Sequence, residues 1–526
     1  MKALLSTRAS RAWLGVALVG LVVIVLVFAL GLIPRLTAGQ HVIDAAKPAV
    51  TDERVAGDRA GIDFISKYVD LADPLMTPRG GGSDEVATLV ELVGRRTRRP
   101  ARDVAALLHK EAPHTEALLR ALPLSAAADE IPAFTGYLAT TLNLPEEDLA
   151  AEVEQSFPKL SQTLTALPIV TGGWNDIPGA GGLTRFDGKT PVRTMPELRD
   201  YFSGDLVATV ERDHRDVQDV ASNGGIGYIP WLLLVIGVGL LAYGALQVWR
   251  VASAAPPGRR QWSVVAAVGV VILGVVLVLH YVPRLNAADR VISDLEPAFA
   301  EQRVQGDRAG SDMIHQAVLL GDPIVTARGG AAAEGPRLVA FVSARTNLSH
   351  DTVRGALLRR APHIAALLQA MPLSEVAAEV PHLVRFLARM MRTRPDRLLV
   401  TLRRRTPHLA QAILTVRPVT LGWNAVPGTE KLTDFKGTTS VRTMPALDQY
   451  FSTDVIPVLE TQRENFFDLA DPWPPVNALA LLLFVLGALV TLYGLLMMRV
   501  TTTRQRAPRA PRRAILRRMR RRRASR

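Results

Sequence analysis

The sequence predicts a mainly α-helical, polytopic membrane protein with four transmembrane helices and two duplicated extracytoplasmic helical domains, each with a small irregular or β-hairpin element. Three observations predict this fold class: four long apolar runs, a repeat of the whole pattern 249 residues later, and basic residues on one side of every run. At 526 residues and 48% hydrophobic composition, the chain can form several compact units, since single domains usually take roughly 100 to 200 residues.

The four apolar runs contain no Asp, Glu, Lys or Arg. A helix rises about 1.5 Å per residue, so about 20 residues cover a hydrocarbon core of about 30 Å. The first run also has the pattern of a signal peptide, a basic start followed by an apolar stretch. An uncleaved anchor is favoured, because Trp13 and Gly20 recur as Trp262 and Gly269 in the third run, which is internal.

Basic residues flank the runs on the side predicted to be cytoplasmic, because Lys and Arg are retained there. Lys2 precedes the first run, Arg259 lies between the second and third, and an Arg-rich tail follows the fourth. We therefore expect a multi-pass protein of the cell membrane with both termini in the cytoplasm. The predicted segments are a cytoplasmic N-terminus 1–12, spans 13–33, 229–249, 263–282 and 478–498, outer domains 34–228 and 283–477, a cytoplasmic loop 250–262 and a cytoplasmic tail 499–526.

Aromatic residues near the ends of the runs are expected to anchor the helices at the membrane interfaces. Trp13, Trp249 and Trp262 lie near the predicted inner boundary, and Tyr228 and Tyr281 near the outer one.

The formal charge of +13 resides entirely in the tail, which has thirteen Arg and no acid from residue 499 onward. Anionic lipid of the inner leaflet is the nearest polyanion, so it is favoured over nucleic acid as the partner of this tail. The chain has no cysteine, which excludes disulfides and thiolate metal sites. Abundant Arg, Ala and Val suggest a bacterial source. The predicted lipid-binding residues are Arg517, Arg518, Arg520, Arg521, Arg522 and Arg523.

A shorter period of about 45 residues inside each outer domain predicts pairs of short helices. Pro113 is echoed by Pro158, and Pro362 by Pro407, as expected of proline in a first helical turn. Residues 174–193 are rich in Gly, Pro, Thr and Asn and predict an ordered loop with a small hairpin.

Motifs of catalysis are missing from the sequence, which has no nucleophile elbow, no zinc helix, no phosphate loop and no dinucleotide fingerprint. We therefore expect a protein that is not an enzyme and needs no cofactor. Four histidines follow a proline, but their spacing does not support a metal site. They are interpreted as helix-start residues that contact their own turn: His114, His363, His382 and His408.

Charged residues that recur in both halves are interpreted as structural ion pairs, with Arg193 and Arg442 as expected partners. These are Arg54, Asp58, Arg59, Asp63, Arg303, Asp307, Arg308 and Asp312. The alternative is a site for a polar ligand, where aromatic, amide and guanidinium groups meet. Its candidate residues are Arg79, Arg328, Trp174, Asn175, Arg193, Trp423, Asn424 and Arg442.

The spans carry no ionisable core residue, which counts against ion-coupled transport. Gly237 and Gly244 recur as Gly487 and Gly494, and predict helix faces that pack between the two modules or between protomers. The favoured function is a non-catalytic bacterial envelope protein whose tandem outer domains bind a protein, lipid or wall partner, or scaffold a membrane complex. The alternatives are a transport component, which would need a continuous apolar cavity, and an extracytoplasmic enzyme with an unfamiliar site. A homo-oligomer is left open.

Overall fold

The computed structural model describes residues 8–221, 226–253, 258–326, 330–470 and 473–506. These residues are mostly helical and form no β-strand. Their contacts divide the chain into two compact units. We name them the span unit, which comprises Met1–Lys47, Arg215–Glu296 and Gln462–Arg526, and the intertwined unit, which comprises Pro48–His214 and Pro297–Thr461.

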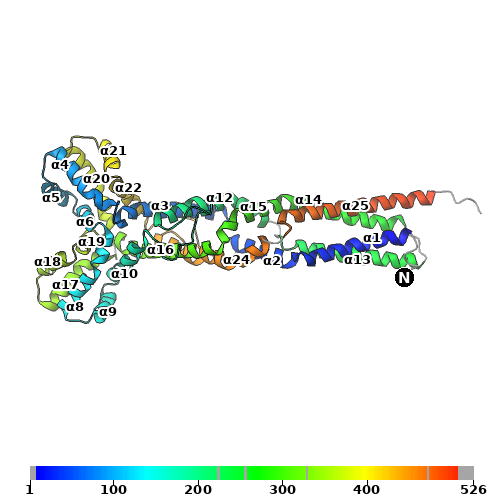
Figure 1. Cartoon of the computed structure of the whole chain (residues 1–526), viewed down its shortest axis with the longest axis horizontal. Helices are drawn as coiled ribbons and strands as arrows, with labels where there is room; N and C mark the ends of the chain where they lie inside the picture. The colour runs from blue at the N-terminus through cyan, green and yellow to red at the C-terminus, as the bar shows by residue number, and fades with distance from the viewer. Residues whose placement is uncertain (1–7, 222–225, 254–257, 327–329, 471–472, 507–526) are drawn as a thin grey trace, which may run out of the picture. The chain divides into compact units, whose positions relative to one another are not determined.

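Helices recur at equivalent positions in the first and second halves of the chain, as Figure 1 labels them. For example, α10 (Pro158–Gly173) and α22 (Pro407–Gly422) are shifted by 249 residues. The first half also has α3 (Asp52–Met76), α4 (Gly82–Thr97), α5 (Ala101–Glu111), α6 (Pro113–Ala121), α7 (Leu124–Asp129), α8 (Ile131–Leu142), α9 (Glu146–Ser156), α11 (Met195–Tyr201), the π-helix η1 (Phe202–Leu206) and α12 (Val207–Ala221). The second half has α16 (Glu301–Val325), the short 3₁₀ helix η3 (Ala331–Ala333), α17 (Glu334–Thr346), α18 (His350–Arg360), α19 (Pro362–Ala370), α20 (Leu373–Met390), α21 (Pro395–Arg405), α23 (Met444–Tyr450), the π-helix η4 (Phe451–Val455) and α24 (Ile456–Ala470).

The span unit contains the four predicted membrane-crossing helices, each long and apolar enough to span a bilayer. α1 (Arg8–Ala29) packs on α13 (Ile229–Ala252), and α14 (Arg259–Val278) packs on α25 (Val476–Arg506). Glycines bring the paired backbones together: a Cβ on Gly244 would lie 2.5 Å from the backbone nitrogen of Ala17. The predicted glycine faces therefore pack within each half rather than between the halves.

Trp13 and Trp262 are not interfacial anchors, contrary to the sequence-based expectation. Both are fully buried, and their rings stack with centroids 3.6 Å apart and an interplanar angle of 7°. The Tyr493 hydroxyl donates to the carbonyl of Ala12 at 2.8 Å beside this stack. The stack therefore joins α1 to α14, and so links the two halves inside the span unit.

The first and third apolar runs continue past the ends of their helices. α1 ends at Ala29, and Gly31 has a positive φ of 55° that starts a new helix, α2 (Leu32–Ala46). The third run breaks in the same way at His280, before α15 (Tyr281–Phe299). The predicted boundaries 33 and 282 are therefore too late, because hydropathy does not register a left-handed residue.

Two buried arginines join the halves next to these breaks. Arg35 Nε donates to the carbonyl of Leu469 at 3.0 Å, and Arg284 Nε donates to the carbonyl of Asp219 at 2.9 Å. Each guanidinium thus binds the last carbonyls of a helix from the other half, where the helix dipole favours a cation.

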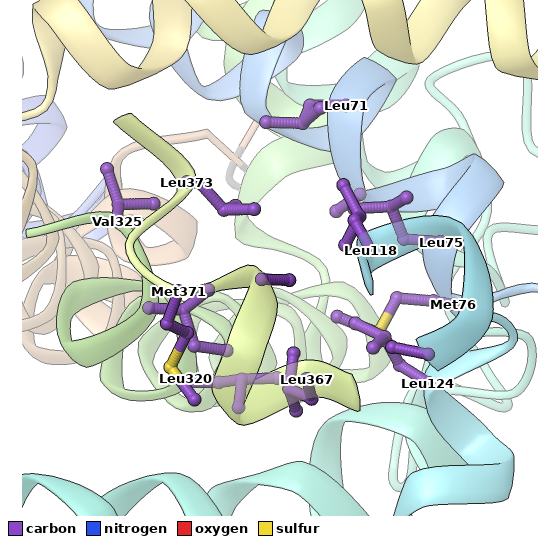
Figure 2. Packing of buried hydrophobic residues seen from close by; sticks show 14 of the residues in the cluster. Leu71, Leu75, Met76, Leu118, Leu124, Leu320, Val325, Leu367, Met371 and Leu373 are labelled. Atoms are coloured by element: carbon purple, nitrogen blue, oxygen red, sulfur yellow. The ribbon is translucent and has the colours of Figure 1, made fainter. Parts of the chain in front are cut away.

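The intertwined unit has a core to which both halves contribute. α3 packs on α22, and α16 packs on α10, so each half lays one long helix against the other half. Figure 2 shows Leu71, Leu75 and Met76 from α3 in the same cluster as Leu320 and Val325 from α16. Residues 48–214 and 297–461, which make up most of the predicted outer ranges 34–228 and 283–477, therefore belong to one compact unit with a common core.

The loop after α10 was expected to hold a small hairpin, and it forms only one antiparallel bridge, between Thr184 and Pro191. The Asp187 carboxylate accepts hydrogen bonds from the backbone N–H groups of Lys189 and Thr190, which fixes the turn. The second half has a matching bridge between Thr433 and Ser440.

Candidate binding site between the two halves

An apolar cavity of about 120 Å³ lies inside the intertwined unit and is lined by both halves. Its wall pairs side chains at equivalent positions, such as Ile65 with Ile314 and Phe202 with Phe451. Aliphatic residues of the helices that follow complete the wall: Leu206, Val207, Val210, Val455, Ile456 and Leu459. Equivalent segments of the two halves therefore meet at the cavity.

Two π-helical turns border this cavity, η1 and η4. A π-helical turn holds an extra residue in the helix and is often found at functional positions. Tyr201 and Tyr450 immediately precede these turns and are buried, whereas Phe202 and Phe451 line the cavity. The widened turns thus place an aromatic ring against the cavity from each half.

Acidic residues supply the few polar groups at the cavity wall. Asp58 and Asp448 line it together with Ser311. The Oδ2 of Asp448 lies 2.6 Å from Nδ1 of His315, and burial raises the pKa of Asp448 against the opposing effect of this histidine. The wall therefore offers carboxyl groups to a ligand.

The polar groups near the cavity differ between the halves, because Arg199 occupies the position equivalent to Asp448. Arg199 forms an ion pair with Asp70 at 2.5 Å instead.

Asp58 and Asp307 occupy equivalent positions on α3 and α16, where Asp58 is half-buried at the cavity wall. Burial raises the pKa of Asp58 to about 7, opposed by the Tyr450 hydroxyl and by Arg54. The pKa of Asp307 is likewise raised to about 7 by burial, opposed by Tyr201 and Arg303. Asp307 is completely buried, and within the described part of the chain neither carboxylate oxygen accepts a geometrically good hydrogen bond. Such carboxyls are mostly protonated below about pH 7 and mostly ionised above it.

The neighbouring arginines bind the loop of the opposite half. Arg303 donates to the carbonyls of Thr184 at 3.1 Å and Arg185 at 2.8 Å, and its guanidinium lies 5.0 Å from the Phe186 ring centroid. Arg54 repeats this arrangement with the carbonyl of Asp434 at 2.9 Å and the Phe435 ring at 5.0 Å. Because these donors bind carbonyl groups, Asp307 and Asp58 keep only a long-range charge interaction with them.

The ligand site proposed from the sequence is not assembled as expected. Trp174 and Trp423 are fully buried, and their indole N–H groups donate to Asp73 at 3.0 Å and Asp322 at 3.1 Å. Their ring faces therefore pack in the core and are not open to a ligand. The other described candidates are exposed: Arg79, Asn175, Arg193, Asn424 and Arg442. Arg328 and the tail residues Arg517, Arg518 and Arg520 to Arg523 lie outside the described residues.

The expected partners Arg193 and Arg442 do not form the predicted ion pairs. Arg442 donates to the carbonyl of Glu430, and the backbone N–H of Arg193 donates to Glu197. Other pairs take their place. Arg59 lies 3.3 Å from both Asp63 and Glu211, and Arg308 lies 3.2 Å from Glu460, whereas Asp312 lines a surface groove beside Arg308.

Four proline-initiated helices receive a glutamate from the opposite half at their N-termini. The Glu379 carboxylate accepts from the backbone N–H of Thr115 at 2.8 Å and of His114 at 3.1 Å, which begin α6. Glu130, Glu85 and Glu334 occupy the same role at α19, α22 and α10. A carboxylate suits this place because the first N–H groups of a helix are unpaired and the dipole favours an anion.

Three of the four histidines contact the opposite half, so the interpretation that they contact their own turn is wrong for these three. His382 is also not a helix-start residue, because it follows Pro381 inside α20. His114 Nδ1 lies 2.9 Å from the Gln369 carbonyl, His363 Nδ1 lies 2.7 Å from Glu130, and His382 Nε2 lies 3.1 Å from Glu111.

Replacing Glu379 with Ala is expected to lower the free energy of unfolding by about 1 to 3 kcal/mol, because two backbone donors and the Thr115 hydroxyl lose their acceptor. Urea unfolding of the purified protein measures the change. Glu379→Gln keeps an acceptor and should lose less. Glu375→Ala, at an exposed position one turn earlier on α20, is the matched control and should lose less than about 1 kcal/mol, the usual contribution of an exposed acid in a first helical turn. Equal losses in all three variants would contradict the capping role.

Among the described residues, no group of three or more His, Asp or Glu side chains is arranged to hold a metal ion. No protein-family model, curated protein or solved structure matches this chain. The site is therefore interpreted from its own geometry.

Sequence reasoning missed the tyrosines beside Asp58 and Asp307. The recurrence of Tyr201-Phe202-Ser203 as Tyr450-Phe451-Ser452 was the available signal, since it shows two aromatic positions kept in both halves.

Proposed function

We propose that this chain is a non-catalytic, multi-pass membrane protein of a bacterial envelope that binds an apolar ligand in the cavity between its two halves. In this proposal the four apolar helices cross the cell membrane, both termini lie in the cytoplasm, and the intertwined unit lies outside. The basic residues Arg250, Arg259 and Arg260 between the second and third spans support this orientation. The Arg-rich tail then lies beside the anionic inner leaflet.

The observation that carries the proposal is the chemistry of the cavity wall. Its lining is aliphatic and aromatic except for Asp58, Asp448 and Ser311. A dry cavity of about 150 Å³ in another protein binds benzene, so 120 Å³ suits a molecule or chain end of similar size. Burial of each methylene contributes about 0.8 kcal/mol, which makes an alkyl chain end the favoured occupant. The carboxyl groups give such a ligand one polar contact.

A transport component is the second candidate. The intertwined unit has this cavity of about 120 Å³ and an apolar one of about 50 Å³, lined by Leu71, Leu118 and Val376 among others. The span unit has larger apolar spaces of about 430 and 300 Å³, which share Val19, Leu486 and Leu489. The transport candidate has less support because the spans carry no ionisable core residue. An enzyme with an unfamiliar site has less support: Ser311 lines the cavity and His315 contacts Asp448, but no hydrogen bond joins Ser311 to His315 among the described residues.

Filling the cavity tests the proposal. Ser311→Phe places a ring in the space, and Ser311→Ile installs the residue found at the equivalent position, Ile62. The full chain is purified in detergent, and bound apolar molecules are extracted and quantified by mass spectrometry. We expect the wild-type protein to carry an alkyl-containing molecule, Ser311→Ile to carry several-fold less, and Ser311→Phe to carry none.

Thr140→Phe, at an exposed position on α8, is the matched control and should retain the ligand. Circular dichroism shows whether each variant is folded, and Ser311→Ile keeps the test valid if the larger ring prevents folding. A folded Ser311→Ile variant with undiminished ligand, or a wild-type protein free of apolar molecules, would overturn the proposal.

A further inference from the structure

Equivalent segments of the two halves carry opposite charge. Residues 136–156 contain five acidic residues and no Lys or Arg, whereas residues 385–405, their counterparts 249 positions later, contain eight arginines and one acid. The helices α9 and α21 within these segments are each 11 residues long. They bury the same two positions, Leu149 and Val153 in α9 and Leu398 and Leu402 in α21. The backbone has thus been kept while the charge on the outer face has been inverted.

The basic surface is exposed and unpaired. Six of its arginines lie in or just before α21, and each is exposed. They form no ion pair within the described residues: Arg392, Arg394, Arg397, Arg403, Arg404 and Arg405. Six unpaired guanidinium groups on one short segment repel each other. Binding of an anionic partner relieves this repulsion and lowers the free energy.

The acidic surface on α9 is its complement. Glu146, Glu147, Asp148 and Glu154 are exposed, and Glu152 forms an ion pair with Arg345 at 3.2 Å. α9 packs on α8 and α10, whereas α21 packs on α4, α20 and α22. Figure 1 shows α21 and α9 on opposite sides of the intertwined unit. The two surfaces therefore cannot neutralise each other within one chain.

We propose that the arginine surface of α21 docks on the acidic surface of α9 in a second copy of this chain. Charge complementarity favours a second copy as the partner, because each chain carries both an arginine surface and an acidic surface on helices of equal length. Opposite surfaces on two sides of one unit give a head-to-tail contact, which leaves one surface of each kind free at the ends and extends into a row or a ring. Exposed charges are screened by salt, so the association weakens as ionic strength rises.

Charge reversal tests the proposal with the full chain in detergent. One variant carries Arg403→Glu, Arg404→Glu and Arg405→Glu, and a second carries Glu146→Arg, Glu147→Arg and Asp148→Arg. Sedimentation velocity at about 50 mM and about 500 mM salt, which differ several-fold in screening length, measures the association. The wild-type protein should associate at low salt and dissociate at high salt. Each variant alone should associate far less than the wild type, because three reversals cancel the net charge of the arginine surface in the first variant and remove the net negative charge of α9 in the second.

Mixing the two variants should restore association, because the first keeps the wild-type acidic surface and the second keeps the wild-type arginine surface. The matched control reverses three exposed arginines elsewhere, Arg193, Arg354 and Arg359, and should associate like the wild type. Failure of the mixture to associate would overturn the proposal. A wild-type protein that stays a single copy at low salt but binds a soluble polyphosphate through α21 would also overturn it, in favour of an anionic polymer as the partner.

Discussion

Asp307→Asn is expected to stabilise the intertwined unit most at pH 8 and by a smaller amount at pH 5. The pKa of Asp307 is raised from 3.8 to about 7 in the folded protein, so the folded state holds a proton that the unfolded chain releases between these values. Stability from this group is therefore fully present below pH 4 and is lost as pH rises to about 7. A shift of this size corresponds to about 4 kcal/mol, and the neutral amide should recover much of that loss at pH 8.

Hydrogen exchange of α16 in increasing urea, at pH 5 and pH 8, measures this effect in the intertwined unit itself. Asp312→Asn is the matched control, because Asp312 is exposed on the same helix. It should leave the pH dependence unchanged. If Asp307→Asn lost stability with rising pH as steeply as the wild type, burial of this carboxyl would not be the cause.

Arg303→Met is expected to lower the free energy of unfolding by about 3 kcal/mol or more, the second large effect. The guanidinium donates to the carbonyls of Thr184, Arg185 and Pro297, and methionine leaves these part-buried acceptors without that donor. Urea unfolding measures the loss. Arg303→Lys should fall between methionine and the wild type, because one ammonium cannot reach all the carbonyls in the planar geometry of a guanidinium.

Arg308→Met serves as the control on the same helix, since Arg308 is exposed and its ion pair with Glu460 contributes less than about 1 kcal/mol. The double variant Arg303→Met/Asp307→Asn should have a higher free energy of unfolding than the sum of the two single-variant changes predicts. Removing the cation leaves a buried carboxyl with no opposing charge, and the amide removes that penalty. Strict additivity would show that Arg303 acts only through the loop.

The sequence predicted the number of apolar helices but not all of their ends. Length and hydropathy are sufficient for the former, because a bilayer fixes how many apolar residues a helix needs. The break at Gly31 depends on one backbone angle, which no hydropathy pattern contains. The burial of Trp13 depends in turn on which helix lies beside it, and an interfacial and a buried tryptophan have the same surroundings in sequence.

The sequence repeat could not predict that α3 packs on α22 of the other half, and α16 on α10. A helix with the apolar face of α3 buries the same residues whether it packs on α10 of its own half or on α22 of the other half. Hydrophobic periodicity is therefore identical for the two arrangements, and the 249-residue offset reports equivalence, not pairing. For the same reason Asp58 and Arg54 were recognised as recurring charged residues, whereas their contacts with Tyr450 and Phe435 were not predicted.

Because α3 packs on α22, α3 cannot complete its packing until the ribosome has synthesised α22. α3 ends at Met76, and α22 does not begin until Pro407. At about 5 to 20 residues per second, roughly 20 to 70 s pass on the ribosome before the principal partner of α3 exists. During that time a nascent first half shows the same unpaired surface to every neighbouring nascent chain, so crowding of ribosomes on one message should favour mispairing between molecules, and slower initiation should favour the native product.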